Sequence, residues 1–222
     1  MKIFSLPAQS DRKALLFDMD QTLYSHDEYA QTQTDLPVMR LAQIKGKTFE
    51  QMSSEISAFR KNWADSHNGK SISLGNTFLS FGISIEENIK WREELCRPQD
   101  YLVHDELLHA VLFELSCRFT LAVVTNNPVS VALRTLSVLG VNDVIKNIAG
   151  LDTCFLSKPH KDIFYKAAQI CGVSVQQCIS IGDRFDIDIA LPLELGMGGI
   201  LVGGVEDVYK LSEILIPAIP LN

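Results

Sequence analysis

Short apolar runs alternate with stretches of helical pattern through the second half of the chain. Each run has the length and composition of a buried strand, and the stretch that follows places apolar residues at helical spacing. The expected strands cover residues 14–17, 119–125, 144–148, 178–181 and 199–202, and the expected helices residues 104–116, 128–139, 162–171, 184–195 and 206–215. This order predicts an α/β fold with a doubly wound, Rossmann-like parallel sheet.

A long polar and helical segment interrupts the alternation directly after the first strand. In residues 48–63 the apolar side chains recur on one helix face, and Thr48 with Gln51 fits a capping box at the start of that helix. Further helices are expected at about residues 35–45, 72–80 and 85–95. We therefore expect two domains: a core made of residues 1–24 and 105–222, and an inserted helical domain made of residues 25–104.

Composition restricts the class of protein and of partner. The 222 residues are 46% hydrophobic and 21% charged, as in a globular protein, and the formal net charge of -7 argues against a nucleic-acid polymer as partner. The five cysteines form no CxxC pair, which suits reduced thiols. The first eleven residues lack a signal-peptide core and no apolar stretch is long enough to span a membrane, so we expect a cytoplasmic protein without a membrane partner.

The first strand runs straight into two acids, Asp18 and Asp20. Residues i and i+2 of an extended chain point the same way, so both carboxylates would face one side. Two like charges this close are tolerated mainly where a cation or a shared proton offsets them. Asp is also common in turns and caps at strand ends, and these residues alone leave both interpretations open.

Other polar residues share the structural position of these acids. Each group follows an expected strand or precedes an expected helix, and such positions meet at one edge of a parallel sheet. The groups are Asp18 with Asp20, Thr125 with Asn126, Lys158, and Asp183 with Asp186 and Asp188. The sequence therefore predicts one site at this edge.

In these residues the chain resembles the haloacid dehalogenase (HAD) superfamily. The resemblance rests on four motifs in the family's order: Asp18-Met19-Asp20-Gln21-Thr22, an apolar strand that ends in Thr125-Asn126, Lys158-Pro159, and Gly182-Asp183 with Asp188. It covers the whole predicted core and implies a HAD-like catalytic core, with residues 25–104 as a helical cap of the family's first type.

The resemblance implies a role for each motif residue. Asp18 would be the nucleophile that forms an aspartyl-phosphate, and Asp20 the general acid and base. Thr125 and Asn126 would bind the phosphoryl oxygens, and Lys158 would supply positive charge. Mg²⁺ would be held by Asp18, Asp183 and the Asp20 carbonyl group, with Asp188 supporting from a second shell. Asp186 is interpreted as a helix N-terminal acid, and His26 and His160 as surface residues.

The acid at position 20 favours a phosphatase over the family's dehalogenases, which lack it. We expect a small phosphorylated metabolite as substrate. Alternatives are a nucleotide 5'-monophosphatase of the pyrimidine nucleotidase kind, a sugar phosphomutase, and a non-catalytic binding module; phosphoglycolate phosphatases share the cap plan. The sequence does not indicate an oligomeric state.

Residues 44–49 resemble the glycine-containing loop that such caps insert into the active site. Lys45 and Lys47 would then contact an anionic substrate. Gly46 as a helix C-cap between two solvated lysines explains the same residues equally well.

Overall fold

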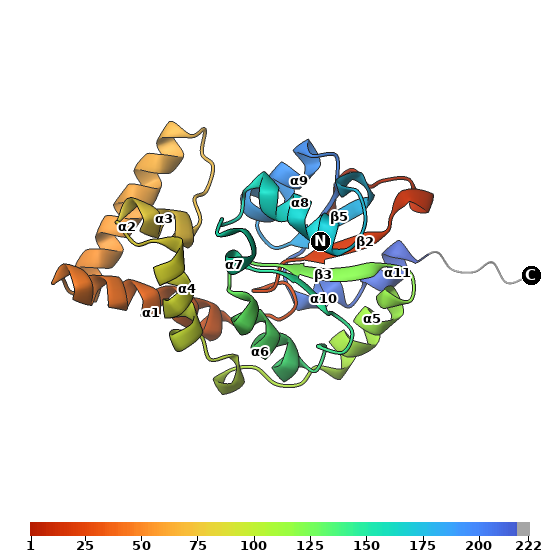
Figure 1. The fold of residues 1–222 in the computed structure, drawn as a ribbon, viewed down its shortest axis with the longest axis horizontal. Helices are drawn as coiled ribbons and strands as arrows, with labels where there is room; N and C mark the ends of the chain where they lie inside the picture. The colour runs from red at the N-terminus through yellow and green to blue at the C-terminus, as the bar shows by residue number, and fades with distance from the viewer. Residues whose placement is uncertain (217–222) are drawn as a thin grey trace, which may run out of the picture.

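The computed structural model describes residues 1–216, in which six strands form one sheet covered by helices (Figure 1). The strand order is β1-β6-β5-β2-β3-β4, and every neighbouring pair is parallel except β1 with β6. The strands are β1 (Lys2–Ile3), β2 (Ala14–Phe17), β3 (Thr120–Val124), β4 (Asn147–Ala149), β5 (Cys178–Gly182) and β6 (Gly198–Leu201). The predicted α/β class with a Rossmann-like core is confirmed.

Helices pack on both faces of the sheet, with α5 and α6 on one side and α8 and α9 on the other (Figure 1). Alternating side chains of β2 supply both cores: Leu15 and Phe17 join one apolar cluster, and Ala14 and Leu16 join the other. The helices are α5 (Glu106–Ser116), α6 (Val129–Leu139), α7 (Leu151–Cys154), α8 (Lys161–Ile170), α9 (Ala190–Glu194), α10 (Val205–Val208) and α11 (Leu211–Leu215). Three single turns of 3-10 helix lie at Gln9–Asp11, Pro98–Asp100 and Val175–Gln177.

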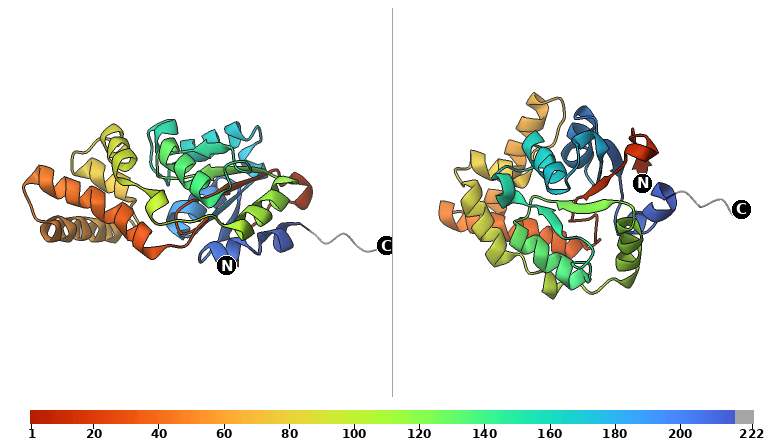
Figure 2. Two further views of the ribbon diagram at one scale, coloured as in Figure 1. Left: turned by 90° about the horizontal axis from the view of Figure 1, so that it is seen from below. Right: turned by 45° about the vertical axis from the view of Figure 1, so that its right-hand side comes forward.

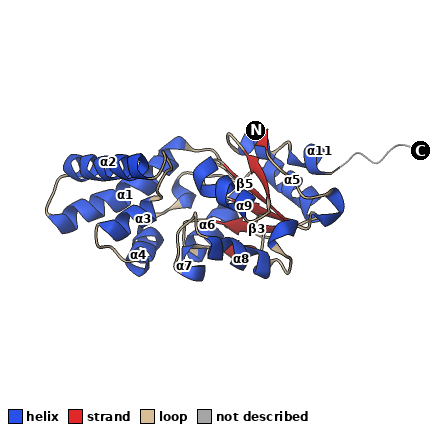
Figure 3. Ribbon diagram, turned by 90° about the horizontal axis from the view of Figure 1, so that it is seen from above, coloured by secondary structure: helices blue, strands red, loops and turns tan. Residues whose placement is uncertain are grey.

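Four further helices lie together at one end of the sheet (Figures 2 and 3). They are α1 (Asp27–Lys45), α2 (Phe49–Ser66), α3 (Leu74–Ser80) and α4 (Ile85–Leu95). This helical insert has its own apolar cluster, to which Leu41, Met52, Phe78 and Trp91 contribute. Thr48 begins α2 with the expected capping box.

The helical insert contacts the sheet-containing part through apolar and polar side chains. Ile85 and Ile89 of α4 form a buried apolar cluster with Leu151 of α7. Ser73 Oγ lies 2.8 Å from Ser157 Oγ, and Arg134 Nη2 donates to the carbonyl oxygen of Glu93 at 3.0 Å. In residues 1–216 no helix has the length and apolar character needed to cross a membrane.

Several elements differ from the sequence prediction. Helix α1 begins at Asp27 rather than near residue 35 and contains Pro37, which is buried with its neighbours on one face of the helix. That packing compensates for the backbone hydrogen bond that a proline cannot donate. Strand β1 and helix α7 were not expected, because two and four residues carry no readable period. The segment expected as one helix at 184–195 begins with a π-helical stretch at Phe185–Ile189, and the last expected helix is divided into α10 and α11.

The strand register aligns the polar ends of the three central strands. Phe17, the last residue of β2, lies opposite Val123 of β3 and Ile181 of β5. Asp18 follows directly, and its backbone N–H donates to the carbonyl oxygen of Ile181 at 2.7 Å. The loops that leave β2, β3 and β5 therefore emerge at the same level of one sheet edge.

Candidate active site

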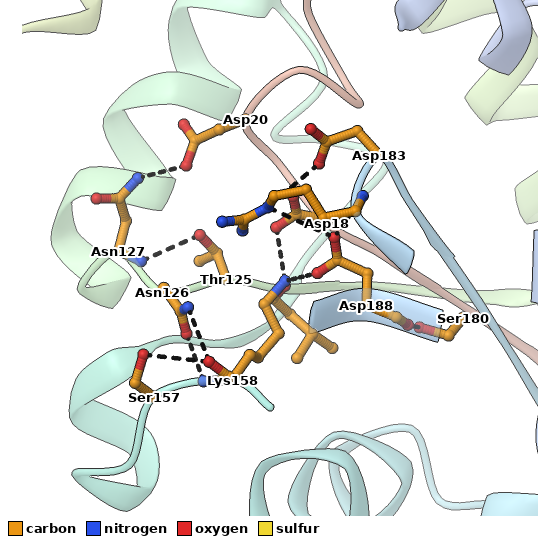
Figure 4. Close-up of polar contacts among 12 residues, drawn as sticks. Asp18, Asp20, Thr125, Asn126, Asn127, Ser157, Lys158, Ser180, Asp183 and Asp188 are labelled. Carbon is orange, nitrogen blue, oxygen red and sulfur yellow. Dashed lines mark hydrogen bonds and ion pairs between the residues drawn. The ribbon is translucent and has the colours of Figure 1, made fainter. Parts of the chain in front are cut away.

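Lys158 lies at the centre of the polar cluster, in the loop before α8 (Figure 4). Its side chain is 1% exposed, and Nζ donates to Asp18 Oδ1, Asp188 Oδ1 and the carbonyl oxygen of Val124, each at 2.7 Å. Burial alone lowers the pKa of a lysine, but the charges of Asp18 and Asp188 outweigh it and raise the pKa of Lys158. The ammonium group is therefore charged, and all three of its N–H groups are satisfied.

Three carboxylates converge beside this ammonium group. One oxygen from each of Asp18, Asp183 and Asp188 lies within 4.8 Å of the others. Asp18 Oδ2 and Asp183 Oδ1 are buried and have no hydrogen-bond partner within residues 1–216. Burial, followed by the charge of Asp18, raises the pKa of Asp183 to about 7. This clustering of acids leaves negative charge that Lys158 alone does not offset.

Asp188 differs from the other two acids because both of its oxygens are engaged. Oδ1 accepts from Lys158, and Oδ2 accepts from the backbone N–H of Arg184 at 3.1 Å. Of the three acids, only Asp18 and Asp183 therefore present a buried oxygen without a hydrogen-bond partner among the described residues. An oxygen-only donor set with unpartnered buried oxygens fits a hard divalent cation.

Thr125 and Asn126 follow β3 and lie beside the loop that carries Lys158. Thr125 is fully buried, and its Oγ1 accepts from the backbone N–H of Asn127 at 3.1 Å. Asn126 Oδ1 accepts from the backbone N–H of Lys158 at 2.6 Å, while Asn126 Nδ2 donates to the carbonyl oxygen of Lys158 at 3.3 Å. Asn126 thus holds the loop that carries Lys158.

Asp20 makes its contacts with a different set of residues. Its Oδ1 accepts from the Tyr24 hydroxyl and from Gln33 Nε2 at 3.0 Å, and its Oδ2 accepts from Asn127 Nδ2 at 2.9 Å. Gln33 comes from α1 of the helical insert, and its Oε1 accepts from the same Asn127 amide at 2.9 Å. Burial, followed by the charge of Asp18, raises the pKa of Asp20, which favours the protonated form that a general acid needs.

A pocket of about 220 Å³ opens between this network and the helical insert. Asp20, Asn126 and Asp183 line it from the sheet side, and Arg92 lines it from α4. Arg92 is 8% exposed, and its Nη1 donates to Asn127 Oδ1 at 2.8 Å. Arg184 also lines the pocket, with Nε 3.7 Å from Asp183 Oδ1 and 3.9 Å from Asp188 Oδ2.

Most of the predicted site residues meet at this sheet edge, but two do not. Asp18, Asp20, Thr125, Asn126, Lys158, Asp183 and Asp188 lie together (Figure 4). Lys45 and Lys47 are exposed at the turn between α1 and α2, where Gly46 ends α1 in the left-handed conformation with φ 64°. Lys47 pairs with Glu55 at 2.6 Å, and neither lysine lines the pocket. The structure thus shows the C-cap arrangement.

Other residues singled out in the sequence have local structural contacts. Asp186 accepts from the backbone N–H of Ser71 at 3.2 Å. His26 and His160 are the N-cap residues of α1 and α8. None of the three belongs to the carboxylate cluster.

Sequence reasoning missed Tyr24, Gln33, Arg92 and Asn127. Asn127 stands next to the Thr125-Asn126 pair and could have been included on that ground. Gln33 and Arg92 carry no such signal, because they belong to the helical insert and reach Asp20 and Asn127 only through tertiary packing.

Comparisons with known proteins agree with this geometry. Residues 12–195 match the haloacid dehalogenase-like hydrolase family. A glyceraldehyde 3-phosphate phosphatase from Methanocaldococcus jannaschii is 26% identical over 218 residues, which span 90% of this chain and 88% of that protein. A phosphoglycolate phosphatase from Colwellia psychrerythraea is 28% identical over 109 residues, and that match spans 49% of this chain and about half of the relative, 48%.

Solved structures show the same fold at low sequence identity. A HAD phosphatase from Thermococcus onnurineus has a TM-score of 0.61 and 20% identity, covering 92% of this chain and 98% of that one. A putative HAD-hydrolase from Bacillus subtilis, bound to magnesium, has a TM-score of 0.55 and 17% identity, covering 90% and 98%. Because the family match covers the helical insert and strands β2 to β5, the chain belongs to the haloacid dehalogenase-like hydrolases.

Proposed function

We propose that this chain is a magnesium-dependent phosphatase that hydrolyses a small phosphomonoester through a phosphorylated Asp18. One observation carries the proposal: Lys158 is buried between Asp18 and Asp188, while Asp18 Oδ2 and Asp183 Oδ1 are buried without a hydrogen-bond partner among the described residues. A stabilising ion-pair network has no need to leave two buried carboxylate oxygens unsatisfied. A site that binds a cation leaves such oxygens unpaired, because the cation becomes their partner.

Asp18 and Asp183, with the Asp20 carbonyl group, would hold Mg²⁺, and Asp188 would keep Lys158 in place. The ion, when bound, would offset the negative charges of the Asp18 carboxylate and the substrate phosphate. The hydrogen bonds support the separate role of Asp188, since both of its oxygens are engaged. Magnesium rather than zinc suits the donor set, because no histidine or cysteine belongs to the described cluster.

The residues of the chain divide the reaction into two steps. In the first, the Asp18 carboxylate forms a bond to phosphorus as the bond to the alcohol oxygen breaks, and Asp20 gives that oxygen its proton. In the second, Asp20 takes a proton from water as the water oxygen attacks phosphorus, and Asp18 leaves as a carboxylate. Lys158, Thr125 and Asn126 would stabilise the charge on the phosphoryl oxygens throughout.

The helical insert would act as the cap that covers this reaction. It supplies Gln33 and Arg92 to the pocket wall, so the substrate would be enclosed between cap and sheet edge. Two curated relatives carry the names of phosphatases whose named substrates are small phosphomonoesters. Those names favour a phosphatase over the alternatives of a nucleotidase, a mutase or a binding module.

Hydrolysis of p-nitrophenyl phosphate by the purified protein tests the proposal. We expect magnesium-dependent release of p-nitrophenol by the wild type and its loss in Asp18→Asn. Asp65→Asn, which alters an exposed acid on α2, should retain full activity and serves as the control. Equal activity in the wild type and in Asp18→Asn would refute the proposed nucleophile.

A further inference from the structure

Arg92 is a buried cation without an acidic partner. Its side chain is 8% exposed, and it forms no ion pair with any acid in residues 1–216. Charged side chains are almost never this buried unless an opposite charge compensates them. Arg92 instead donates from Nη1 to the neutral amide of Asn127. Arg92 interacts electrostatically with Asp20, but no acid of the described chain contacts the guanidinium group directly.

One edge of the guanidinium group has no hydrogen-bond partner in residues 1–216. Nε is buried and has no hydrogen-bond partner within the described chain, and the bond that Arg92 donates to Asn127 uses Nη1. Guanidinium groups bind carboxylates through two parallel N–H groups, and the edge formed by Nε and Nη2 offers such a pair. The geometry thus suits a planar anion with two oxygens.

The position of Arg92 shows which part of a substrate would reach it. Arg92 lines the pocket from α4, and Asn127 connects it to Asp20, whose Oδ2 accepts from the same amide group. Asp20 is the group that would protonate the leaving alcohol, whereas Lys158 and Thr125 are on the phosphoryl side. The unpartnered edge of Arg92 consequently belongs to the leaving-group end of the pocket.

We propose that Arg92 binds a carboxylate on the leaving group, so that the substrates are small phosphomonoesters of hydroxy acids. This inference rests on the proposed function, because it assigns the far end of the same substrate. The pocket volume of about 220 Å³ suits a leaving group of a few carbon atoms.

Arg184, the other arginine of the pocket, is a weaker candidate for this contact. Its Nε lies 3.7 Å from Asp183 and 3.9 Å from Asp188, so its charge is already compensated by two acids of the cluster. It is also 48% exposed, which reduces the energy that it would gain from a new anion. Arg92 has neither limitation.

A matched pair of substrates tests the inference. 2-Phosphoglycolate and 2-hydroxyethyl phosphate differ by a carboxylate in place of a hydroxymethyl group. We expect the wild type to show at least a roughly tenfold higher kcat/KM for 2-phosphoglycolate. In Arg92→Gln, kcat/KM should fall about 100-fold for 2-phosphoglycolate and about tenfold or less for the neutral ester, so that the preference disappears.

The ratio of the two kcat/KM values separates recognition from a structural role. Loss of the Arg92 bond to Asn127 would slow both substrates alike, whereas loss of a carboxylate contact changes the ratio. Arg92→Lys, which keeps the charge but not the fork, should give an intermediate ratio, and Lys90→Gln, at an exposed position of the same helix, should leave it unchanged.

Two results would overturn the inference. One is a wild type without preference for the carboxylate substrate, a measurement that needs no variant to fold. The other is an equal loss for both substrates in Arg92→Gln and Arg92→Lys. In either case, hydrolysis of p-nitrophenyl phosphate that depends on Asp18 would leave the phosphatase proposal standing.

Discussion

Asp18 and Asp20, the two acids of the proposed mechanism, are two residues apart in sequence but have different surroundings. Asp18 contacts Lys158, which precedes α8 in the sheet-containing part, and lies near Asp183 and Asp188 at the same sheet edge. Asp20 contacts Gln33 of the helical insert and Asn127, which in turn holds Arg92 of the insert. One half of the site is complete without the insert, and the other half is not.

This difference separates the requirements of the two halves. The Asp18 half depends on strand register, because the ends of β2, β3 and β5 lie at one level whatever the insert does. The Asp20 half depends on the docking of α1 and α4. We infer that the sheet alone positions Asp18 for attack on phosphorus. Proton transfer from Asp20 to the leaving group also requires the helical insert to be docked.

The largest effect is expected at Lys158, the centre of the Asp18 half. Lys158→Met removes the cation between two buried carboxylates, so we expect kcat for p-nitrophenyl phosphate to fall by about 10³ and the free energy of unfolding by about 3–5 kcal/mol. Urea unfolding and steady-state kinetics measure both. Lys161→Met, at an exposed position of α8, should change neither. Activity near that of the wild type in Lys158→Met would contradict the role of this residue.

Asn127 tests the Asp20 half. Asn127→Ala removes one hydrogen bond from Asp20 and the bond that connects Asp20 to Arg92. We expect kcat for an alkyl phosphate to fall by about 10–100-fold. The fall for p-nitrophenyl phosphate should be smaller, since its leaving group needs no proton.

The control for this comparison is Ser130→Ala, which removes a contact from α6 to Glu93 of the insert without touching Asp20. It should affect both substrates little. An equal loss for the alkyl and the nitrophenyl ester in Asn127→Ala would show that Asn127 does not act through Asp20.

The dependence of activity and stability on Mg²⁺ tests whether Asp183 is a metal ligand. We expect a chelator to abolish activity, and saturating Mg²⁺ to stabilise the wild type by about 1–3 kcal/mol, seen as a rise in Tm. Asp183→Asn should lose most of this rise, whereas Asp65→Asn should keep it. A full Tm rise in Asp183→Asn would remove Asp183 from the metal site.

The smallest effect is expected at the turn between α1 and α2. Lys45→Ala combined with Lys47→Ala should leave KM within about twofold of the wild type, because both lysines are exposed and Lys47 pairs with Glu55. A clear rise in KM would show that this turn reaches the substrate in a cap position other than the one described.

The two halves also differ in how far the sequence predicts them. Asp18, Thr125, Lys158 and Asp183 follow apolar strands or precede helices, and a parallel sheet brings such positions together, so pattern alone places them at one edge. The chemical roles proposed for these four residues come from the resemblance to the haloacid dehalogenase superfamily. The sheet order follows from the same alternation, except for β1, whose two residues have no period of their own.

The contacts of the insert lie beyond this kind of reasoning. Gln33 and Arg92 stand on helices whose periodicity indicates only which face is buried. Which of those residues meets Asp20 or Asn127 depends on how the insert docks, and no local pattern encodes that. Gly46 shows a related limit, because its local pattern fits both a substrate loop and a helix C-cap. In this structure Gly46 is the C-cap of α1.

The division of labour between Asp18 and Asp20 is tested most directly by trapping the phosphorylated enzyme. Asp20→Asn, mixed with p-nitrophenyl phosphate and Mg²⁺ and quenched in acid, should carry a phosphoryl group on the peptide that contains residue 18. The activated leaving group departs without a proton, but water then lacks its base. Asp18→Asn should carry none. Turnover by Asp20→Asn without a phosphorylated peptide, or a phosphoryl group on another residue, would contradict the account.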